Sequence, residues 1–359
     1  MIALILGVAA AYAEPYLAVR EGYTCGQCHV NHTGGGMRTP FGSLFAQTNL
    51  PIATWDGAPD ATRFASPALT DAATIGANLR LANTTVLPAT FVGVETRTVE
   101  AENAFSVPEG NLFLKLDVFQ DHASLYLDQT LVPFLAPREA FILVEGGPGL
   151  YAKAGQFLQP YGVRLLDDDT STRTVTQIRY DTPELGVEVG LDRAPAVVSV
   201  AVTDSGGAGF GKKVIGSGAL VLRRGRIGVS GSVADSLVED EHTPRYMGGA
   251  WGGLGLGRLA LFGEIDVVHD ETELWDQLAA FGEADLLVAR GTNLKVEVDY
   301  HDRHLGVPED FRSRVVAGVE LFPVQFLQVS LFYQARFDIP QAAPADKVDR
   351  IVLQLHGFY

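Results

Sequence analysis

Two cysteines, Cys25 and Cys28, stand two residues apart and are followed at once by His29. This pattern is typical of the attachment site for a c-type haem, in which the thiols add to the vinyl groups and the imidazole binds the iron. The chain contains 2 cysteines in 359 residues. One covalent haem c would use both thiols, so the motif also excludes a disulfide framework.

A redox-active cysteine pair and a zinc site are the alternative interpretations of this motif. A redox-active pair usually lies near a strand-helix-strand unit, and no such alternation of helix and strand patterns follows. Zinc could recruit Cys25, Cys28 and His32, but the sequence offers no well-spaced ligands to complete that site. Haem is favoured further because thioether attachment takes place outside the cytoplasm, and the chain begins like an exported protein.

Residues 1–13 are apolar apart from Tyr12 and end in Ala11-Tyr12-Ala13, a small-x-small box typical of signal peptides. We therefore expect cleavage before Glu14. No Lys or Arg precedes Arg20, so either the true start lies upstream or the amino terminus alone supplies the positive charge. A membrane anchor is disfavoured because the run is too short to cross a bilayer as a helix.

The haem iron needs axial ligands, and His29 is the predicted proximal one. Met37 is the candidate distal ligand, because the three glycines at 34–36 let the backbone turn around the haem edge. A His/Met pair would raise the reduction potential relative to two histidines. His32 is the rival, although three residues from His29 it would emerge on the same side of the haem. A barrel histidine, water or no sixth ligand remain open, as does a packing role for Met37.

Composition limits the partners of the chain. The formal net charge of -16 argues against nucleic acid and anionic lipid headgroups, and favours basic proteins or cations. Hydrophobic residues make up 47% and charged residues 19%, while 39 glycines interrupt the apolar runs. No segment after the signal approaches the length of a transmembrane helix.

From residue 74 onward the sequence consists of short alternating segments divided by Gly, Pro and Asp, which predicts antiparallel strands. In one segment Leu294, Val296 and Val298 point to one face, whereas Glu297 and Asp299 point to the other. The segments reach about ten residues, the length of a tilted membrane strand, whereas strands of globular sheets average about five or six.

Connections between these segments alternate in size, as in outer-membrane barrels with short periplasmic turns and longer extracellular loops. The short turns fall at 223–226, 254–257, 289–292 and 322–324, and the longer loops at 204–212, 236–244, 269–275, 302–310 and 338–346. We expect a transmembrane antiparallel β-barrel of about 16–18 strands, the lower number applying if a division near Arg193–Pro195 is not a turn. An even count places both ends of the barrel on the periplasmic side.

Three segments resemble known families. Cys25 to Gly42 resembles the haem segment of porin-cytochrome proteins, and Lys153 to Arg164 resembles the strand followed by Pro, an aromatic residue and Gly in phosphate-selective porins. Ile351 to Tyr359, which ends on aromatics, resembles the C-terminal strand of outer-membrane barrels. The resemblances imply the outer membrane of a Gram-negative bacterium, with the haem segment on the periplasmic side.

The chain is therefore expected to divide into a signal peptide at 1–13, a monohaem c-type cytochrome segment at 14–50, a linker or plug at 51–73 and a barrel at 74–359. Charges on the inward strand faces are expected to meet lumen water, because Arg or Lys in the lipid costs about 2–4 kcal/mol at the midplane. They are Glu264, Asp266, Glu283, Asp285, Glu297, Asp299 and Glu320, partly offset by Lys295, Arg312, Arg314 and Arg336.

The expected function is electron transfer at or across the outer membrane by a porin-like barrel with one haem. One haem cannot carry electrons across a hydrocarbon core about 30 Å thick, so multihaem c-type cytochromes or other redox proteins are the expected redox partners. Outer-membrane lipid and cations in an acidic lumen are the other expected partners. The alternatives are a diffusion porin whose haem segment is a plug or redox gate, and a structural anchor for cytochromes. No acid-base pair or nucleophile indicates enzymatic turnover.

Overall fold

The structure is a computed structural model that describes residues 14–53, 65–91, 97–119, 122–165, 167–204, 211–238, 241–270, 275–307, 310–338 and 348–359. The expected signal peptide at 1–13 lies outside these residues. The helices are short: α1 (Pro15–Glu21), α2 (Cys25–Cys28), α3 (Pro40–Thr48), α4 (Ser171–Thr176) and the 3-10 turn η2 (Gly147–Gly149). Among the described residues no helix has the length and apolarity to cross a membrane.

Strands form the rest of the regular structure, and each pairs antiparallel with its neighbours. They are β1 (Ala68–Thr70), β2 (Ala73–Val86), β3 (Ala89–Phe91), β4 (Arg97–Val99), β5 (Glu102–Phe119), β6 (Ala123–Val132), β7 (Ala136–Glu145), β8 (Leu150–Phe157), β9 (Glu184–Arg193), β10 (Ala196–Asp204), β11 (Lys212–Leu222), β12 (Gly225–Val238), β13 (Glu241–Leu256), β14 (Leu259–Asp270), β15 (Trp275–Ala289), β16 (Thr292–Asp302), β17 (Phe311–Leu321), β18 (Leu327–Asp338) and β19 (Arg350–Phe358).

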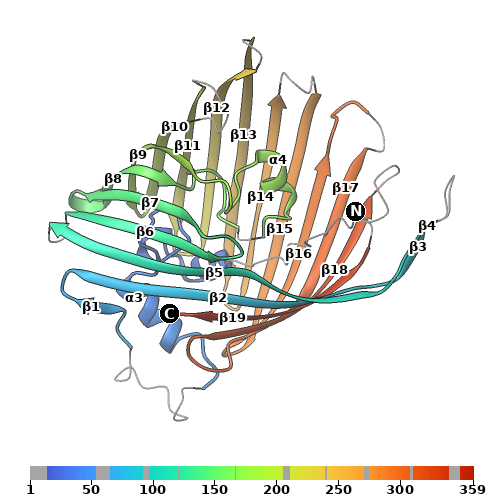
Figure 1. Cartoon of the computed structure of the whole chain (residues 1–359), viewed down its shortest axis with the longest axis horizontal. Helices are drawn as coiled ribbons and strands as arrows, with labels where there is room; N and C mark the ends of the chain where they lie inside the picture. Colours follow the sequence, from blue (N-terminus) through green and yellow to red (C-terminus); the bar gives the residue numbers. More distant parts are fainter. Residues whose placement is uncertain are drawn as a thin grey trace.

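The sheet closes into a barrel because the last strand, β19, pairs with β2 (Figure 1). Within the described residues the sheet has 17 strands, of which the three-residue β1 pairs with β2 beside the wall and the other sixteen form the closed barrel. A separate two-stranded sheet, β3 and β4, extends the connection between β2 and β5. The predicted all-β antiparallel barrel is confirmed, at the lower end of the expected strand range.

The reason expected for the lower strand count is wrong, and so is one expected loop. The division near Arg193–Pro195 is a real turn, because β9 ends at Arg193 and β10 begins at Ala196 and pairs back along it. The count is sixteen because residues 158–183, here called the inner connection, contain α4 instead of strands. The expected long loop at 236–244 is mostly strand, since β12 runs to Val238 and β13 starts at Glu241.

The predicted strand faces are confirmed. Leu294, Val296 and Val298 are 45–49% exposed on the outer wall, while Glu297 and Asp299 are 1% exposed on the inner side. Exposed Leu, Val and Ile side chains recur on nearly every wall strand. The barrel therefore has an apolar exterior and a charged interior, the arrangement that a bilayer requires.

The expectation that the inward charges meet open lumen water is wrong for the carboxylates. All seven are between 0% and 5% exposed, because the chain's own segments cover them. The N-terminal segment, residues 14–53, donates from Tyr16 Oη to Glu320 Oε2 at 2.8 Å. The inner connection places α4 against β14, β15 and β16 (Figure 1). Arg312 and Arg336 are half-buried.

The N-terminal segment is fixed to the end of the barrel that carries the short turns. The backbone N–H of Ile52 donates to Phe322 O at 2.7 Å, and Arg290 Nε donates to Pro51 O at 2.8 Å. Phe322 follows β17, and Arg290 lies between β15 and β16. The cysteine motif therefore enters the interior from this end.

Candidate functional site

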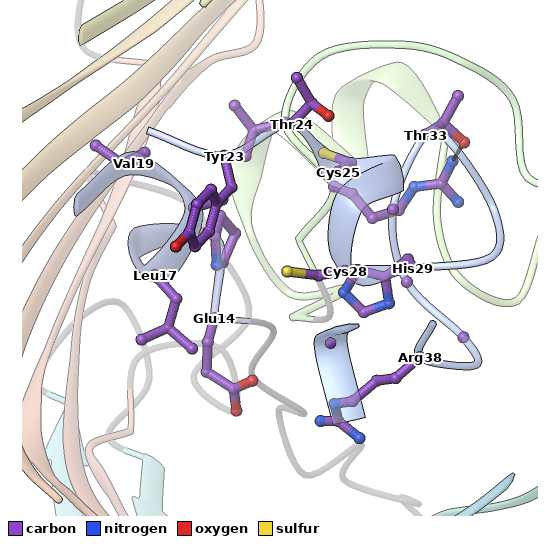
Figure 2. A pocket seen from close by; sticks show the side chains of 18 of the residues that line it. Glu14, Leu17, Val19, Tyr23, Thr24, Cys25, Cys28, His29, Thr33 and Arg38 are labelled. Atoms are coloured by element: carbon purple, nitrogen blue, oxygen red, sulfur yellow. Dashed lines mark hydrogen bonds between the residues drawn. The ribbon is translucent and has the colours of Figure 1, made fainter. Parts of the chain in front are cut away.

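The cysteine motif is a single helical turn that faces an internal cavity. Thr24 precedes α2 in an extended conformation, and its N–H donates to Gln27 Oε1 at 2.8 Å, which caps the helix. His29 leaves the helix in an extended conformation, and its N–H donates to Cys25 O at 2.9 Å. This turn brings Cys25, Cys28 and His29 to one cavity (Figure 2).

The glycines at 34–36 form a loop that only glycine can adopt. Their φ angles are +95°, +79° and +64°. A Cβ on Gly35 would stand 2.2 Å from Tyr180 Oη, and one on Gly36 would stand 2.3 Å from Tyr126 Oη. The loop is thus pressed against both the inner connection and the barrel wall, and it curves around the cavity as the sequence suggested.

The cavity, here called the haem cavity, lies between the N-terminal segment, the inner connection and the barrel wall. Its empty volume is about 1430 Å³, including the part open to solvent. Its apolar lining comes from all three parts: Leu17, Val19, Phe45, Leu50, Phe113, Val163, Trp251 and Phe262. Such a lining suits an apolar ligand.

Five guanidinium groups line the same cavity, against two carboxylates, Glu14 and Glu109. The five are Arg38, Arg80, Arg138, Arg164 and Arg226. Glu109 accepts from Arg80 at 3.0 Å and from Arg138 at 2.5 Å. The Arg38 guanidinium lies 4.4 Å from the centre of the Phe358 ring and forms no side-chain ion pair within the described residues. The excess positive charge suits the carboxylate groups that a haem carries at one edge.

The ionisation of the motif argues against a redox-active pair. Burial raises the pKa of the Cys28 thiol to about 11 and also raises the pKa of Cys25. A redox-active pair needs a lowered thiol pKa. Burial, helped by the Arg38 charge, lowers the pKa of His29 to about 4. The imidazole is therefore neutral at physiological pH, the state that binds iron, and its Nδ1 is buried without a partner among the described residues.

A zinc site is not supported. No group of three or more His, Cys, Asp or Glu side chains is placed to hold a metal ion in the part of the chain that the structure describes.

His32, the rival distal ligand, is bound to the barrel wall and does not line the haem cavity. Its Nδ1 lies 3.1 Å from Asp192 Oδ2, its Nε2 lies 3.4 Å from Glu145 Oε1, and its ring stacks on Tyr151 with centroids 4.2 Å apart. Burial opposes protonation, but the hydrogen bonds to the two carboxylates raise the pKa of His32. Asp192 also accepts from the Gly26 N–H at 2.9 Å, so this contact anchors α2.

Met37, the candidate distal ligand, is also absent from the residues that line the cavity. It is 2% exposed and belongs to a buried apolar cluster with Phe113 and Tyr126. Its N–H donates to Tyr126 Oη at 3.0 Å. The structure therefore brings Cys25, Cys28 and His29 together but places Met37 in packing.

Another histidine reaches the cavity, and it is a barrel histidine of the kind that the sequence analysis left open without identifying it. His356 lies in β19 and lines the cavity from the barrel wall. The period-two pattern of this strand was the available signal, since the exposed Ile351, Leu353 and Leu355 alternate with the buried His356. The arginines of the cavity were missed as well, because they come from separate strands and from the inner connection.

Comparison with known proteins identifies the fold. The chain matches no protein-family model and no curated protein. Among solved structures it is similar to an anion-selective porin from Comamonas acidovorans, with TM-score 0.61 and 9% identity over 80% of this chain and 99% of that one. It is also similar to the outer-membrane protein OmpT of Vibrio cholerae, with TM-score 0.60 and 11% identity over 82% of this chain and 100% of that one. A third similar structure is the outer membrane channel DcaP of Acinetobacter baumannii. Its TM-score is 0.56 and its sequence identity is 10%, over 82% of this chain and 100% of that one. The chain thus has the barrel fold of porins.

Proposed function

We propose that this porin-like barrel resides in the outer membrane, carries one covalent haem on Cys25 and Cys28, and transfers electrons at its short-turn end. One observation carries the proposal: both thiols and the neutral His29 imidazole open onto a single internal cavity with apolar walls and excess guanidinium charge. When bound there, the haem would supply one-electron exchange between ferric and ferrous iron.

The residues of the cavity have separate tasks in this proposal. Cys25 and Cys28 hold the haem by thioether bonds, and His29 supplies an imidazole nitrogen to the iron. The apolar lining excludes water, which strengthens every electrostatic interaction inside. Arg38, unpaired within the described residues, is the guanidinium best placed to meet an acidic edge of the haem.

The barrel wall and the contacts of the N-terminal segment support the proposed membrane and the proposed side of the haem. The apolar exterior and the porin fold support insertion in the outer membrane. Short turns of such barrels face the periplasm, and the N-terminal segment is bound to the short turns. The haem would therefore lie near the periplasmic mouth, where the cysteine motif is matured after export.

Electron transfer is favoured over solute diffusion because ion pairs between wall and internal segments occupy the interior. Arg314 of β17 contacts Asp167 of the inner connection at 2.7 Å, and Arg173 of α4 contacts Glu264 of β14 at 2.5 Å. One haem near one mouth of the barrel cannot carry electrons across a hydrocarbon core of about 30 Å. A partner that carries further haems would complete the electron path. Multihaem c-type cytochromes have that chemistry.

The decisive experiment is haem staining after denaturing electrophoresis of the exported protein. Wild type should retain the stain because the linkage is covalent, and Cys25→Ala combined with Cys28→Ala should lose it. His32→Ala, whose side chain faces the wall, is the matched control and should keep the stain. An unstained wild-type band would contradict the proposal.

Conductance in a planar bilayer then separates electron transfer from diffusion. We expect low conductance for the haem-loaded barrel, because its inward carboxylates are covered. A large, steady conductance would favour the diffusion porin. A stained barrel of low conductance that exchanges no electrons with soluble mediators would favour a structural anchor for cytochromes.

A further inference from the structure

We propose that His356 is the second axial ligand of the haem iron, so that the iron is held by one imidazole from the N-terminal motif and one from the last barrel strand. This inference rests on the proposed function, since it concerns the same haem. It is carried by the position of His356, by its hydrogen bonding and by the engagement of the competing side chains.

The position of His356 is fixed by the barrel wall. Within β19 the side chains alternate, and His356 points inward with 4% exposure. In the strand register it stands between Gln328 of β18 and Arg80 of β2. His356 and Arg80 both line the haem cavity, together with His29. A rigid strand held on both sides positions the ring more accurately than a loop could.

The hydrogen bonding of His356 leaves one ring nitrogen available. Nδ1 donates to Gln328 Oε1 at 3.0 Å, which places the proton on Nδ1 and the lone pair on Nε2. Nε2 is buried and has no hydrogen-bond partner within the described residues. A metal-binding histidine typically donates its other ring N–H to a carbonyl oxygen in this way. An unmatched buried acceptor is costly, and iron would satisfy it.

The other side chains that could bind the iron are engaged elsewhere. Of the histidines whose side chains the structure describes, His29 and His356 line this cavity. His32 is held by Asp192 and Glu145, and Met37 packs with Phe113 and Tyr126. Two imidazoles give a lower reduction potential than a His/Met pair. The partner that donates electrons must then be a correspondingly strong reductant.

The test compares the optical and electron paramagnetic resonance spectra of haem-stained proteins. Wild type should show a low-spin ferric haem with two nitrogen ligands and no sulfur-to-iron charge-transfer band. His356→Ala should keep the stain but lose the low-spin signal, and added imidazole should restore it. His356→Met keeps a ligand in place, and should introduce the charge-transfer band and shift the potential upward.

His301→Ala is the matched control, because His301 lies on an inner strand face but its Nε2 contacts Gln277 at 3.0 Å. It should leave the spectra unchanged. A low-spin spectrum that survives His356→Ala without imidazole, or a high-spin wild type, would overturn this inference while the stain still supports the proposed function. A wild type without stain would overturn both.

Discussion

The guanidinium of Arg38 forms no side-chain ion pair within the described residues. It lies against Phe358, while Arg80 and Arg138 share the carboxylate of Glu109. A positive charge beside a haem favours the reduced iron, which carries one positive charge less. If haem is bound as proposed, the field of the Arg38 charge would therefore affect its reduction potential.

Arg38→Met should accordingly lower the reduction potential by tens of millivolts, on the order of 1 kcal/mol for a single partly screened charge. Arg38→Lys keeps the positive charge and should shift the reduction potential much less. Potentiometric titration followed by the visible spectrum measures both. Equal shifts in the two variants would mean that packing, and not charge, is responsible.

Met37 is a packing residue in this structure. Met37→Leu conserves volume and should cost less than about 1.5 kcal/mol of stability. The visible spectrum of the oxidised haem protein should be unchanged, and the thermal midpoint should fall by only a few degrees. Loss of a sulfur band in this variant would return Met37 to the role of iron ligand that its spacing first suggested.

The inner connection is the element that fills the barrel, and charged contacts dock it to the wall. Arg314 bridges Asp167 and Asp299, both at 2.7 Å, and Glu297 lies 3.9 Å away. All four side chains are at most 6% exposed. Removing the cation would leave three carboxylates buried without it.

We expect Arg314→Met to destabilise the folded barrel by about 3–5 kcal/mol, the usual cost of breaking a buried ion pair from one side. The thermal midpoint in detergent reports this change. Arg336→Met is the control, since Arg336 is 20% exposed and has Asp169 as its ion-pair partner. Equal thermal midpoints in the two variants would mean that the ion pairs of Arg314 do not stabilise the docking of the inner connection against the wall.

The same element contains a pH-dependent group. Burial raises the pKa of Asp168 to about 7, although its carboxylate accepts the Tyr180 N–H at 3.0 Å. An unfolded aspartate ionises near about 3.9, so between these values the folded chain keeps a proton that the unfolded chain has lost. The penalty for ionising Asp168 is absent below about pH 4 and grows as the pH rises toward 7.

Asp168→Asn keeps the acceptor without the charge, so it should raise the thermal midpoint at pH 8 and change it little at pH 4. Asp71→Asn, at an exposed turn between β1 and β2, should show no such difference. A gain that is equal at both pH values would exclude ionisation of Asp168 as its cause.

At the scale of the whole molecule, the apolar exterior decides whether the barrel can assemble in a bilayer. Val296 is 45% exposed on the outer wall of β16. Val296→Arg would place a charge in hydrocarbon at a cost of about 2–4 kcal/mol at the midplane, so the heat-modifiable folded band on gels should be lost. Leu305→Arg, in the connection after β16, adds the same charge outside the strands and should assemble normally. A folded Val296→Arg barrel would place this face away from lipid.

Period-two alternation made the wall predictable, because lipid and interior impose opposite polarity on successive residues of a strand. Its faces at Val296 and Glu297 came directly from that rule. The interior could not be predicted in the same way, since its contacts join residues far apart, such as Tyr16 and Glu320, separated by 304 positions. The inner connection has no periodic pattern, and Met37 looked like a ligand because spacing cannot show which way a side chain turns.

The closure of β19 onto β2 bears on the biogenesis of a haem-loaded barrel. Cys25 and Cys28 precede every wall strand in the sequence, whereas the strand that carries His356 is the last of the described wall strands and completes the wall. If haem is loaded as proposed, Cys25 and Cys28 can receive it while the barrel is still open, before β19 has paired with β2. Assembly of the barrel in the membrane would then follow attachment of the haem to the cysteines. Each assembled barrel would keep its covalently bound haem.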